Sequence, residues 1–143
     1  MFIGTYYHTL EDQNRISIPK SFRTELTPGS VITYGLDGCL FLFTADSWSK
    51  LTDKLAALPL TSKAARDFLR LLTYNATPVE VDKLGRTKLT SSICQIANLK
   101  KEVVFAGALT RVEIWDKARY HSYIDGLNSQ TGELENTLAE LGI

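Results

Sequence analysis

The chain contains a tandem repeat, which limits its possible folds more than any other pattern in it. The segment Glu11–Arg15 returns 71 residues later as Asp82–Arg86. In each copy an acidic residue stands first, an arginine stands last, and Asn14 or Gly85 precedes the arginine. Glycine adopts positive φ freely, and asparagine tolerates it better than most residues. The pattern therefore predicts the same tight left-handed turn in both copies.

The match extends beyond the turn into flanking apolar positions. After one inserted residue the separation becomes 72 residues, so Val31–Gly35 corresponds to Val103–Gly107. A repeat of this length is a whole supersecondary unit, and two copies predict a pseudo-twofold pairing inside one chain. The matched apolar pairs are Leu10 and Val81, Ile18 and Leu89, Phe22 and Ile93, Leu40 and Val112, and Leu42 and Ile114.

Each repeat is predicted to hold four short strands and one helix, from the alternation of its side chains and its turn residues. Pro19 suits the start of the first helix, because its missing N–H costs nothing there. In the first repeat, strands are expected over residues 3–10, 15–18, 31–34 and 39–43, and a helix over 19–26. In the second, strands are expected over 78–81, 86–89, 103–105 and 112–115, and a helix over 90–97.

Further helices are predicted between and after the repeats. Asp46 or Thr44 is expected to cap one helix and Thr61 the next, and Leu58–Leu60 separates them, which predicts a helical hairpin. Asp116 is expected to cap the helix after the second repeat. The pattern leaves open whether the final amphipathic segment packs on its own subunit or on a neighbour; it carries Leu134, Leu138 and Leu141.

Composition is that of a folded protein, with 143 residues and 44% hydrophobic content. No run approaches the roughly 18 apolar residues of a membrane span, and no signal peptide is recognised, so a cytoplasmic location is expected. The net charge of zero argues against a polyanion partner, but the charge is unevenly distributed. Residues 1–115 hold 14 Lys and Arg against 11 Asp and Glu, whereas residues 116–143 hold 2 against 5.

Neither a metal site nor a disulfide framework is predicted. Cys39 and Cys94 lie in no close pair with another sulfur or histidine, and we interpret both as buried thiols. His8 and His121 are also solitary, and we interpret them as surface or half-buried side chains. The chain lacks a glycine-rich phosphate loop and a nucleophile elbow. The sequence therefore predicts no cofactor and no enzymatic activity.

The acidic residues of the turns are best interpreted as turn-shaping. An acid placed like Glu11 or Asp82 can accept backbone N–H bonds or hold the arginine that follows. Asn14 and Gly85 share this role, because they permit the left-handed bend.

The arginines of the turns allow two interpretations. Arg15 and Arg86 can brace the hairpins, and the same guanidinium fork can also grip phosphate or the guanine edge in a major groove. The residues alone do not decide between these interpretations. Neighbouring cations favour a nucleic-acid contact; they are Lys83, Lys20 and Arg23.

Four segments together resemble the bacterial MraZ family: Met1–Gly4, Arg15–Pro19, Asp82–Arg86 and Val112–Trp115. The resemblance covers essentially the whole chain, and each repeat resembles a swapped-hairpin domain of the AbrB and SpoVT type. It implies an α+β fold in which two double-psi-like β units pair as an intramolecular pseudo-dimer with flanking helices. The implied division is a first SpoVT-AbrB-type domain, a helical hairpin connector, a second such domain and a C-terminal helical tail, over residues 5–47, 48–75, 76–119 and 120–143.

The resemblance implies a sequence-specific, DNA-binding transcriptional regulator, cytoplasmic and nucleoid-associated, that acts on the promoter of the division and cell-wall gene cluster. The implied partners are double-stranded DNA with direct promoter repeats and other copies of the chain in a ring, with no membrane. The family's DNA-facing arginines correspond to Arg15 and Arg86, and its turn lysine to Lys83. Lys20 and Arg23 complete the candidate DNA-binding set. Glu11 and Asn14 replace the family's usual aspartate and glycine, and asparagine can keep the bend.

Two other functions compete with DNA binding. In the first, the protein is a structural or interaction ring whose arginines only brace the hairpins. In the second, which the motifs support least, Glu11 or Asp82 serves as a general acid or base.

Overall fold

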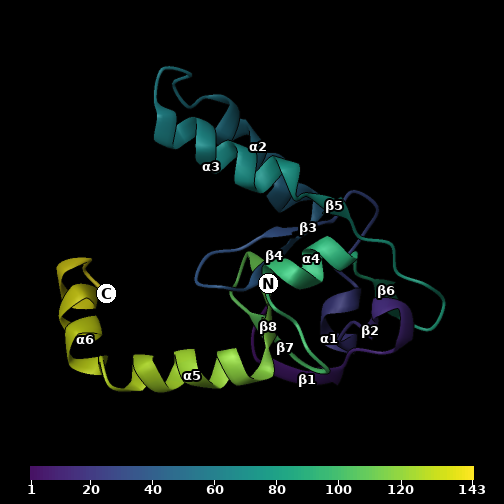
Figure 1. The fold of residues 1–143 in the computed structure, drawn as a ribbon. Coiled ribbons are helices and arrows are strands. Elements are labelled where there is room, and N and C mark those ends of the chain that lie inside the picture. The colour runs from purple at the N-terminus through teal and green to yellow at the C-terminus, as the bar shows by residue number, and fades with distance from the viewer.

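The computed structural model describes residues 1–143. Its centre is a six-stranded antiparallel sheet of order β1-β7-β8-β4-β3-β5, and β2 and β6 form a separate two-stranded ribbon (Figure 1). The strands are β1 (Thr5–Thr9), β2 (Arg15–Ser17), β3 (Val31–Tyr34), β4 (Leu40–Phe43), β5 (Thr77–Pro78), β6 (Arg86–Lys88), β7 (Glu102–Gly107) and β8 (Arg111–Asp116). The helices are α1 (Lys20–Arg23), α2 (Ala45–Ala56), α3 (Lys63–Tyr74), α4 (Ser91–Ile96), α5 (Lys117–Asn128) and α6 (Thr131–Glu140), and a short 3₁₀ turn, η1, spans Asp12–Asn14.

The strands of the two repeats are exchanged. The first strand of each repeat pairs with the third strand of the other, as β1 with β7 and β5 with β3. At the centre of the sheet, Leu40 faces Ile114 and Leu42 faces Val112, which are the positions matched by the repeat. The ladder therefore has an approximate twofold axis between β4 and β8. This confirms the α+β fold in which the repeats form an intramolecular pseudo-dimer.

The main core lies between the sheet and the short helices α1 and α4. Side chains alternate between the faces of a strand, so β7 directs Val103 and Phe105 into this core and Val104 to the opposite face. The opposite face holds a smaller cluster of Cys39, Val104 and Trp115, against which Tyr120 of α5 packs. Both faces of the central sheet are therefore covered, and the ribbon lies at one edge of the main core.

Among the differences from the sequence expectation, three concern the end of helix α1, the extent of strand β5 and the cap of helix α3. Helix α1 ends at Arg23 rather than at residue 26, because the following turn continues with i→i+3 bonds such as Leu26 N–H to Arg23 O, 3.1 Å. Strand β5 ends at Pro78 because Pro78 pairs with Val31, the first residue of its partner β3. A turn that contains Gly29, at φ 98°, comes before β3. Ser62 caps α3 in place of the expected Thr61, with its Oγ accepting from Ala65 N–H at 3.2 Å.

Two other expected helix caps are present, whereas the burial of one cysteine differs from the expectation. Thr44 caps α2 and Asp116 caps α5, as predicted, each accepting a hydrogen bond from the first turn of its helix. Cys39 is buried, but Cys94 is only half-buried, which corrects the prediction of two buried thiols. Cys94 lies on a helix of six residues whose core face is occupied by Ile93.

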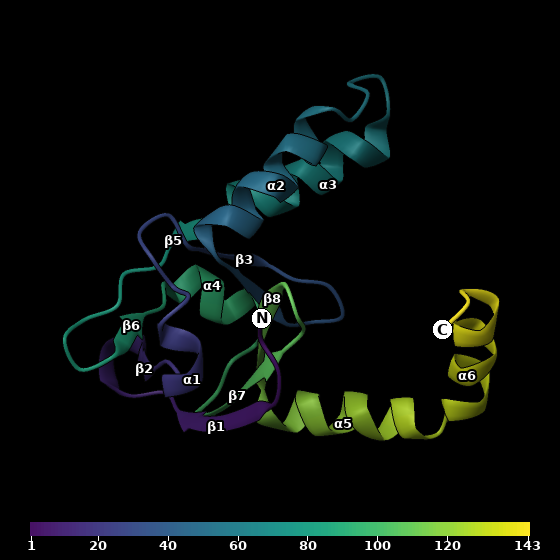
Figure 2. The same ribbon diagram turned by 180° about the vertical axis from the view of Figure 1, so that it is seen from behind.

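Two helical projections extend from the sheet, and both ribbon views show them on the side away from β2 and β6 (Figures 1 and 2). One is the α2–α3 hairpin, residues 45–74, and the other is the α5–α6 arm, residues 117–140. No helix of the structure is long and apolar enough to cross a membrane. The division at residues 47, 75 and 119 stays a prediction, because strands from both repeats share one sheet.

Candidate nucleic-acid interface

Both repeat turns have the left-handed geometry that the sequence predicts. Asn14 has φ 58° and Gly85 has φ 80°. In each turn the acidic residue donates its backbone N–H to the arginine carbonyl, from Glu11 to Arg15 and from Asp82 to Arg86, both at 2.8 Å. The first turn contains a second left-handed residue, Gln13 at φ 61°, for which the sequence had given no signal.

Each turn is fixed by the strand of the other repeat. The Ile18 N–H donates to Gly85 O, and the Leu89 N–H donates to Asn14 O, both at 2.9 Å. These bonds are equivalent under the repeat. The two turns are therefore held as a pair, side by side, although 71 residues separate them in the sequence.

The ribbon of β2 and β6 places cations from both repeats on one face. In its antiparallel register Arg15 faces Lys88, Ile16 faces Thr87, and Ser17 faces Arg86. The central pair is buried, so by strand alternation the other two pairs point away from the core. We call the two strands with these outward side chains the basic ribbon. A two-stranded ribbon has dimensions that the major groove of B-DNA admits.

The surface around the basic ribbon is hollowed on two sides. Arg15 and Arg86 line both hollows, which have volumes of about 730 Å³ and 540 Å³. Lys88 borders the first and Lys101 the second. Acidic side chains also lie there; they are Glu11, Asp12, Glu80 and Asp82. The surface is therefore basic at the ribbon itself rather than over a wide patch.

The acid of the second turn braces its arginine. Asp82 Oδ1 accepts from the backbone N–H groups of Leu84 and Arg86, both at 2.9 Å, and Oδ2 accepts from Arg86 Nε at 3.1 Å. The backbone N–H of Arg86 has the largest effect in lowering the pKa of Asp82, because its hydrogen bond stabilises the charged carboxylate. The side chain of Arg86 and the backbone N–H of Leu84 lower this pKa in the same way. The predicted turn-shaping contact is present in this repeat.

The acid of the first turn acts differently. Glu11 Oε2 lies 3.4 Å from Arg86 Nη1 and makes no hydrogen bond or ion pair with Arg15. Arg15 has no side-chain hydrogen bond or ion pair in the structure, and it is half-buried. Equivalent arginines therefore differ, since Arg86 is held between two carboxylates and Arg15 is free to accept a ligand.

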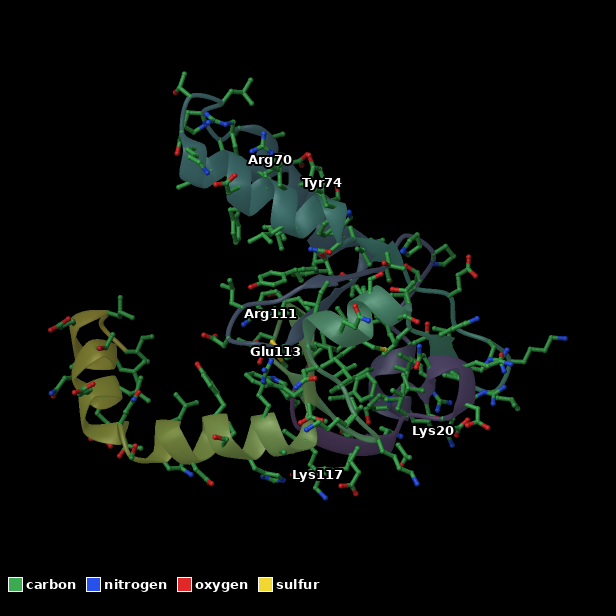
Figure 3. All side chains as sticks on the ribbon, viewed as in Figure 1. Lys20, Arg70, Tyr74, Arg111, Glu113 and Lys117 are labelled. Carbon is green, nitrogen blue, oxygen red and sulfur yellow. The ribbon has the colours of Figure 1, made fainter.

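The remaining predicted residues surround this pair. Lys83 and Lys20 are exposed and unpaired, and Lys20 lies near β2 at the end of the molecule away from α6 (Figure 3). Arg23 is turned inward, with Nε donating to Ile18 O at 2.7 Å. Its guanidinium occupies the space where a side chain on Gly85 would begin, with Cζ at 2.2 Å from that position. Arg23 thus packs against the second turn.

Sequence reasoning missed two cations at this surface. Lys88 stands two residues after Arg86 and shares its face, a signal that strand alternation offered once β6 was predicted. Lys101 is brought to the first turn by the bond from Leu10 N–H to Lys101 O, 2.7 Å. No local pattern indicates that contact, because it depends on the exchange of strands between repeats.

Chemically, the arrangement offers guanidinium and ammonium donors to an anionic or hydrogen-bonding surface. No group of three or more His, Cys, Asp or Glu side chains is placed to hold a metal ion. The predicted candidates for acid and base, Glu11 and Asp82, are instead engaged with Arg86.

Comparison with known proteins gives a consistent result over the full length. The family model described as "MraZ protein, putative antitoxin-like" matches residues 1–71 and again residues 72–139. The chain is 42% identical to a protein of Alkaliphilus metalliredigens named transcriptional regulator MraZ, over 143 residues and 100% of both chains. Proteins of the same name from Halothermothrix orenii and Clostridium tetani are 43% and 39% identical, again over 100% of each chain.

Proposed function

Because the chain belongs to the MraZ family, we propose that it is a sequence-specific DNA-binding transcriptional regulator that contacts DNA through its basic ribbon. The names of its relatives describe a transcriptional regulator and not an enzyme. The proposed targets are repeated elements in the promoter of the division and cell-wall gene cluster. A ring of subunits would present several ribbons to successive repeats, and the protein would then be associated with the nucleoid.

The register of the basic ribbon carries the proposal. It places Arg15 and Lys88 in one outward-facing pair and Arg86 in the other, so cations from both repeats project from a single face. Arginine can bind guanine O6 and N7 with two hydrogen bonds, whereas lysine serves as a point charge for phosphate. The ribbon thus combines groups suited to base contact with groups suited to backbone contact.

The residues receive separate roles in this proposal. Arg15 and Arg86 contact base edges or phosphates at the centre of the ribbon. Lys83 and Lys88 contact the flanking phosphates, and Lys20 lies at the margin. Arg23 supports binding indirectly through its packing against the second turn.

A titration of the purified protein against two labelled duplexes of equal length tests this function. One duplex carries the direct repeats of the gene-cluster promoter, and the other carries the same bases in shuffled order. The proposal expects preferential binding to the repeats, with log affinity falling by about 0.9 per log unit of salt for each neutralised phosphate. Equal affinity for the two duplexes, or no binding, would refute it.

A second function is favoured by one observation, the contact of Arg86 with both Asp82 and Glu11. In that alternative the protein is a structural ring and its arginines only brace the turns. Arg86→Ala would then lower the midpoint of thermal unfolding or dissociate the assembly. If DNA binding is the function, the same variant loses affinity for the repeat duplex and keeps its assembly.

A further inference from the structure

Leu84 is an exposed apolar side chain within the second turn, next to the basic ribbon. Its exposed fraction is 69%, and it belongs to neither of the apolar clusters that form the core. The turn connects β5 with β6, and both ribbon views show this connection projecting at the edge of the molecule opposite α6 (Figures 1 and 2). A single exposed leucine is common on protein surfaces, so exposure alone indicates nothing. The informative observation is its position beside Arg86.

The fold does not require an apolar side chain at this position. The repeat aligns Leu84 with Gln13, which is polar and exposed. The first turn nevertheless keeps a left-handed residue before its arginine, Asn14 at φ 58°, as the second turn does with Gly85 at φ 80°. The inner side of the second turn is already occupied, because the Arg23 guanidinium lies against Gly85. Leu84 is therefore available for a contact outside the chain.

One carboxylate fixes Leu84 and Arg86 relative to each other. Asp82 Oδ1 accepts hydrogen bonds from both of their backbone N–H groups at 2.9 Å, and Asp82 Oδ2 accepts one from Arg86 Nε at 3.1 Å. Two residues of extended chain cover at most about 7 Å, which is about two base steps of DNA. The preformed turn therefore presents an apolar side chain and a guanidinium together to a region of about two base pairs.

Thymine is the base whose exposed groups match an apolar side chain beside an arginine. In the major groove thymine presents its C5-methyl group, which apolar side chains contact, and guanine presents O6 and N7, which arginine binds. No other base of unmodified DNA presents a methyl group there. Phosphate contacts are made by cationic and hydrogen-bonding groups, and the side chain of Leu84 is neither.

We infer that Leu84 determines specificity by contacting the methyl group of a thymine within about two base pairs of the position contacted by Arg86. The inference rests on the proposed DNA-binding function, and it adds a base and the residue that recognises it. The first turn has no equivalent contact, because Gln13 is the counterpart of Leu84. An amide side chain is suited instead to adenine N6 and N7. The two turns of one subunit therefore differ in base preference.

Replacement of thymine by deoxyuridine tests the contact, because it removes only the C5-methyl group and leaves base pairing unchanged. Affinities of the full-length wild type and of Leu84→Ala are measured by fluorescence anisotropy for promoter-repeat duplexes that carry thymine or deoxyuridine in the repeats. The wild type should lose about fourfold in affinity for each thymine methyl that it contacts, because burial of one such group changes an equilibrium constant by about this factor. Leu84→Ala should bind the two duplexes equally.

Two further variants separate this contact from other effects. Leu84→Gln gives the second turn the side chain of the first, so the turn should stay folded and lose its sensitivity to the methyl group. Leu141→Ala removes a leucine of the same 69% exposure from the end of α6 and should keep the wild-type sensitivity. The midpoint of thermal unfolding verifies that each variant is folded. An effect of deoxyuridine on duplex shape would act on all four proteins alike.

Two results would overturn the inference and leave the proposed function intact. In the first, the wild type prefers the repeats to the shuffled duplex but binds thymine and deoxyuridine repeats equally. In the second, the effect of deoxyuridine persists in Leu84→Ala, which assigns it to duplex shape or to another residue. Equal affinity of the wild type for the repeat and shuffled duplexes would instead refute the DNA-binding function, and this inference with it.

Discussion

Arg15 and Arg86 occupy equivalent positions in the repeats but have different surroundings. Arg86 is held by Asp82 at 3.1 Å and by Glu11 at 3.4 Å, whereas Arg15 has no such partner. A free arginine loses up to about 2 kcal/mol of rotamer entropy when it is immobilised, and a braced one has already lost part of it. We therefore expect Arg86 to bind as a preformed contact and Arg15 as an adjustable one. The two repeats would not contribute equally to DNA recognition.

Gly85 is the residue whose replacement should most directly disturb the second turn. Its φ of 80° is left-handed, and a Cβ there would lie 2.2 Å from Arg23 Cζ. Gly85→Ala should lower the free energy of unfolding by roughly 1–2 kcal/mol from backbone strain, with a further loss from displacement of Arg23. Gly132→Ala is the matched control, since its Cβ would meet open space in α6. Equal stability of the two variants in urea unfolding would contradict this account.

The contribution of the Asp82 carboxylate to the free energy of unfolding should depend on pH. Its pKa is lowered in the folded state, so its stabilising effect is complete above the unfolded pKa of about 3.9 and is lost as pH falls through the lower folded value. The difference in unfolding free energy between the wild type and Asp82→Ala should thus be constant near neutral pH and shrink below about pH 4. Asp12→Ala, whose side chain makes no hydrogen bond or ion pair, is the control. A difference that grows on acidification would refute the assignment.

At the scale of elements, the turns were predictable from the sequence and the basic ribbon was not. Asn14 and Gly85 indicate left-handed bends through their own conformational preferences, and the bends are present. The pairing of β2 with β6 depends on hydrogen bonds between residues about 71 positions apart, which no local pattern encodes. The repeat did predict that its copies would pair. It could not identify Lys88 as the cross-strand neighbour of Arg15, nor the attachment of Glu11 to Arg86.

Lys88 provides a test of the ribbon register. If it contacts phosphate, Lys88→Ala should weaken binding to the promoter and shuffled duplexes alike and reduce the salt slope by about 0.9 for each subunit in contact. Lys63→Ala is the control, because Lys63 begins α3 in the hairpin that projects from the sheet (Figure 1). An unchanged salt slope for Lys88→Ala would place the lysine outside the interface.

At the scale of the whole molecule, the proposed functions separate in space. The basic ribbon lies at one end of the sheet, and the α2–α3 hairpin and the α5–α6 arm project from the other side (Figure 2). In the proposed ring, an assembly that used these projections would leave the ribbons free for DNA. Linked ribbons bind successive sites at a high effective concentration, so total affinity can exceed that of one ribbon without new contacts. The modest basic charge of one subunit is then sufficient.

The most direct measurement is the affinity of the Arg15→Ala/Arg86→Ala double variant for the promoter-repeat duplex, followed by fluorescence anisotropy. Its control is Arg66→Ala/Arg70→Ala, which removes the same charge from α3, and sedimentation and thermal unfolding verify that each variant stays assembled and folded. The account predicts that the ribbon variant binds the repeat duplex no better than the shuffled duplex, while the control keeps the preference. Full affinity and preference in the ribbon variant would contradict the claim that this protein binds DNA through its basic ribbon.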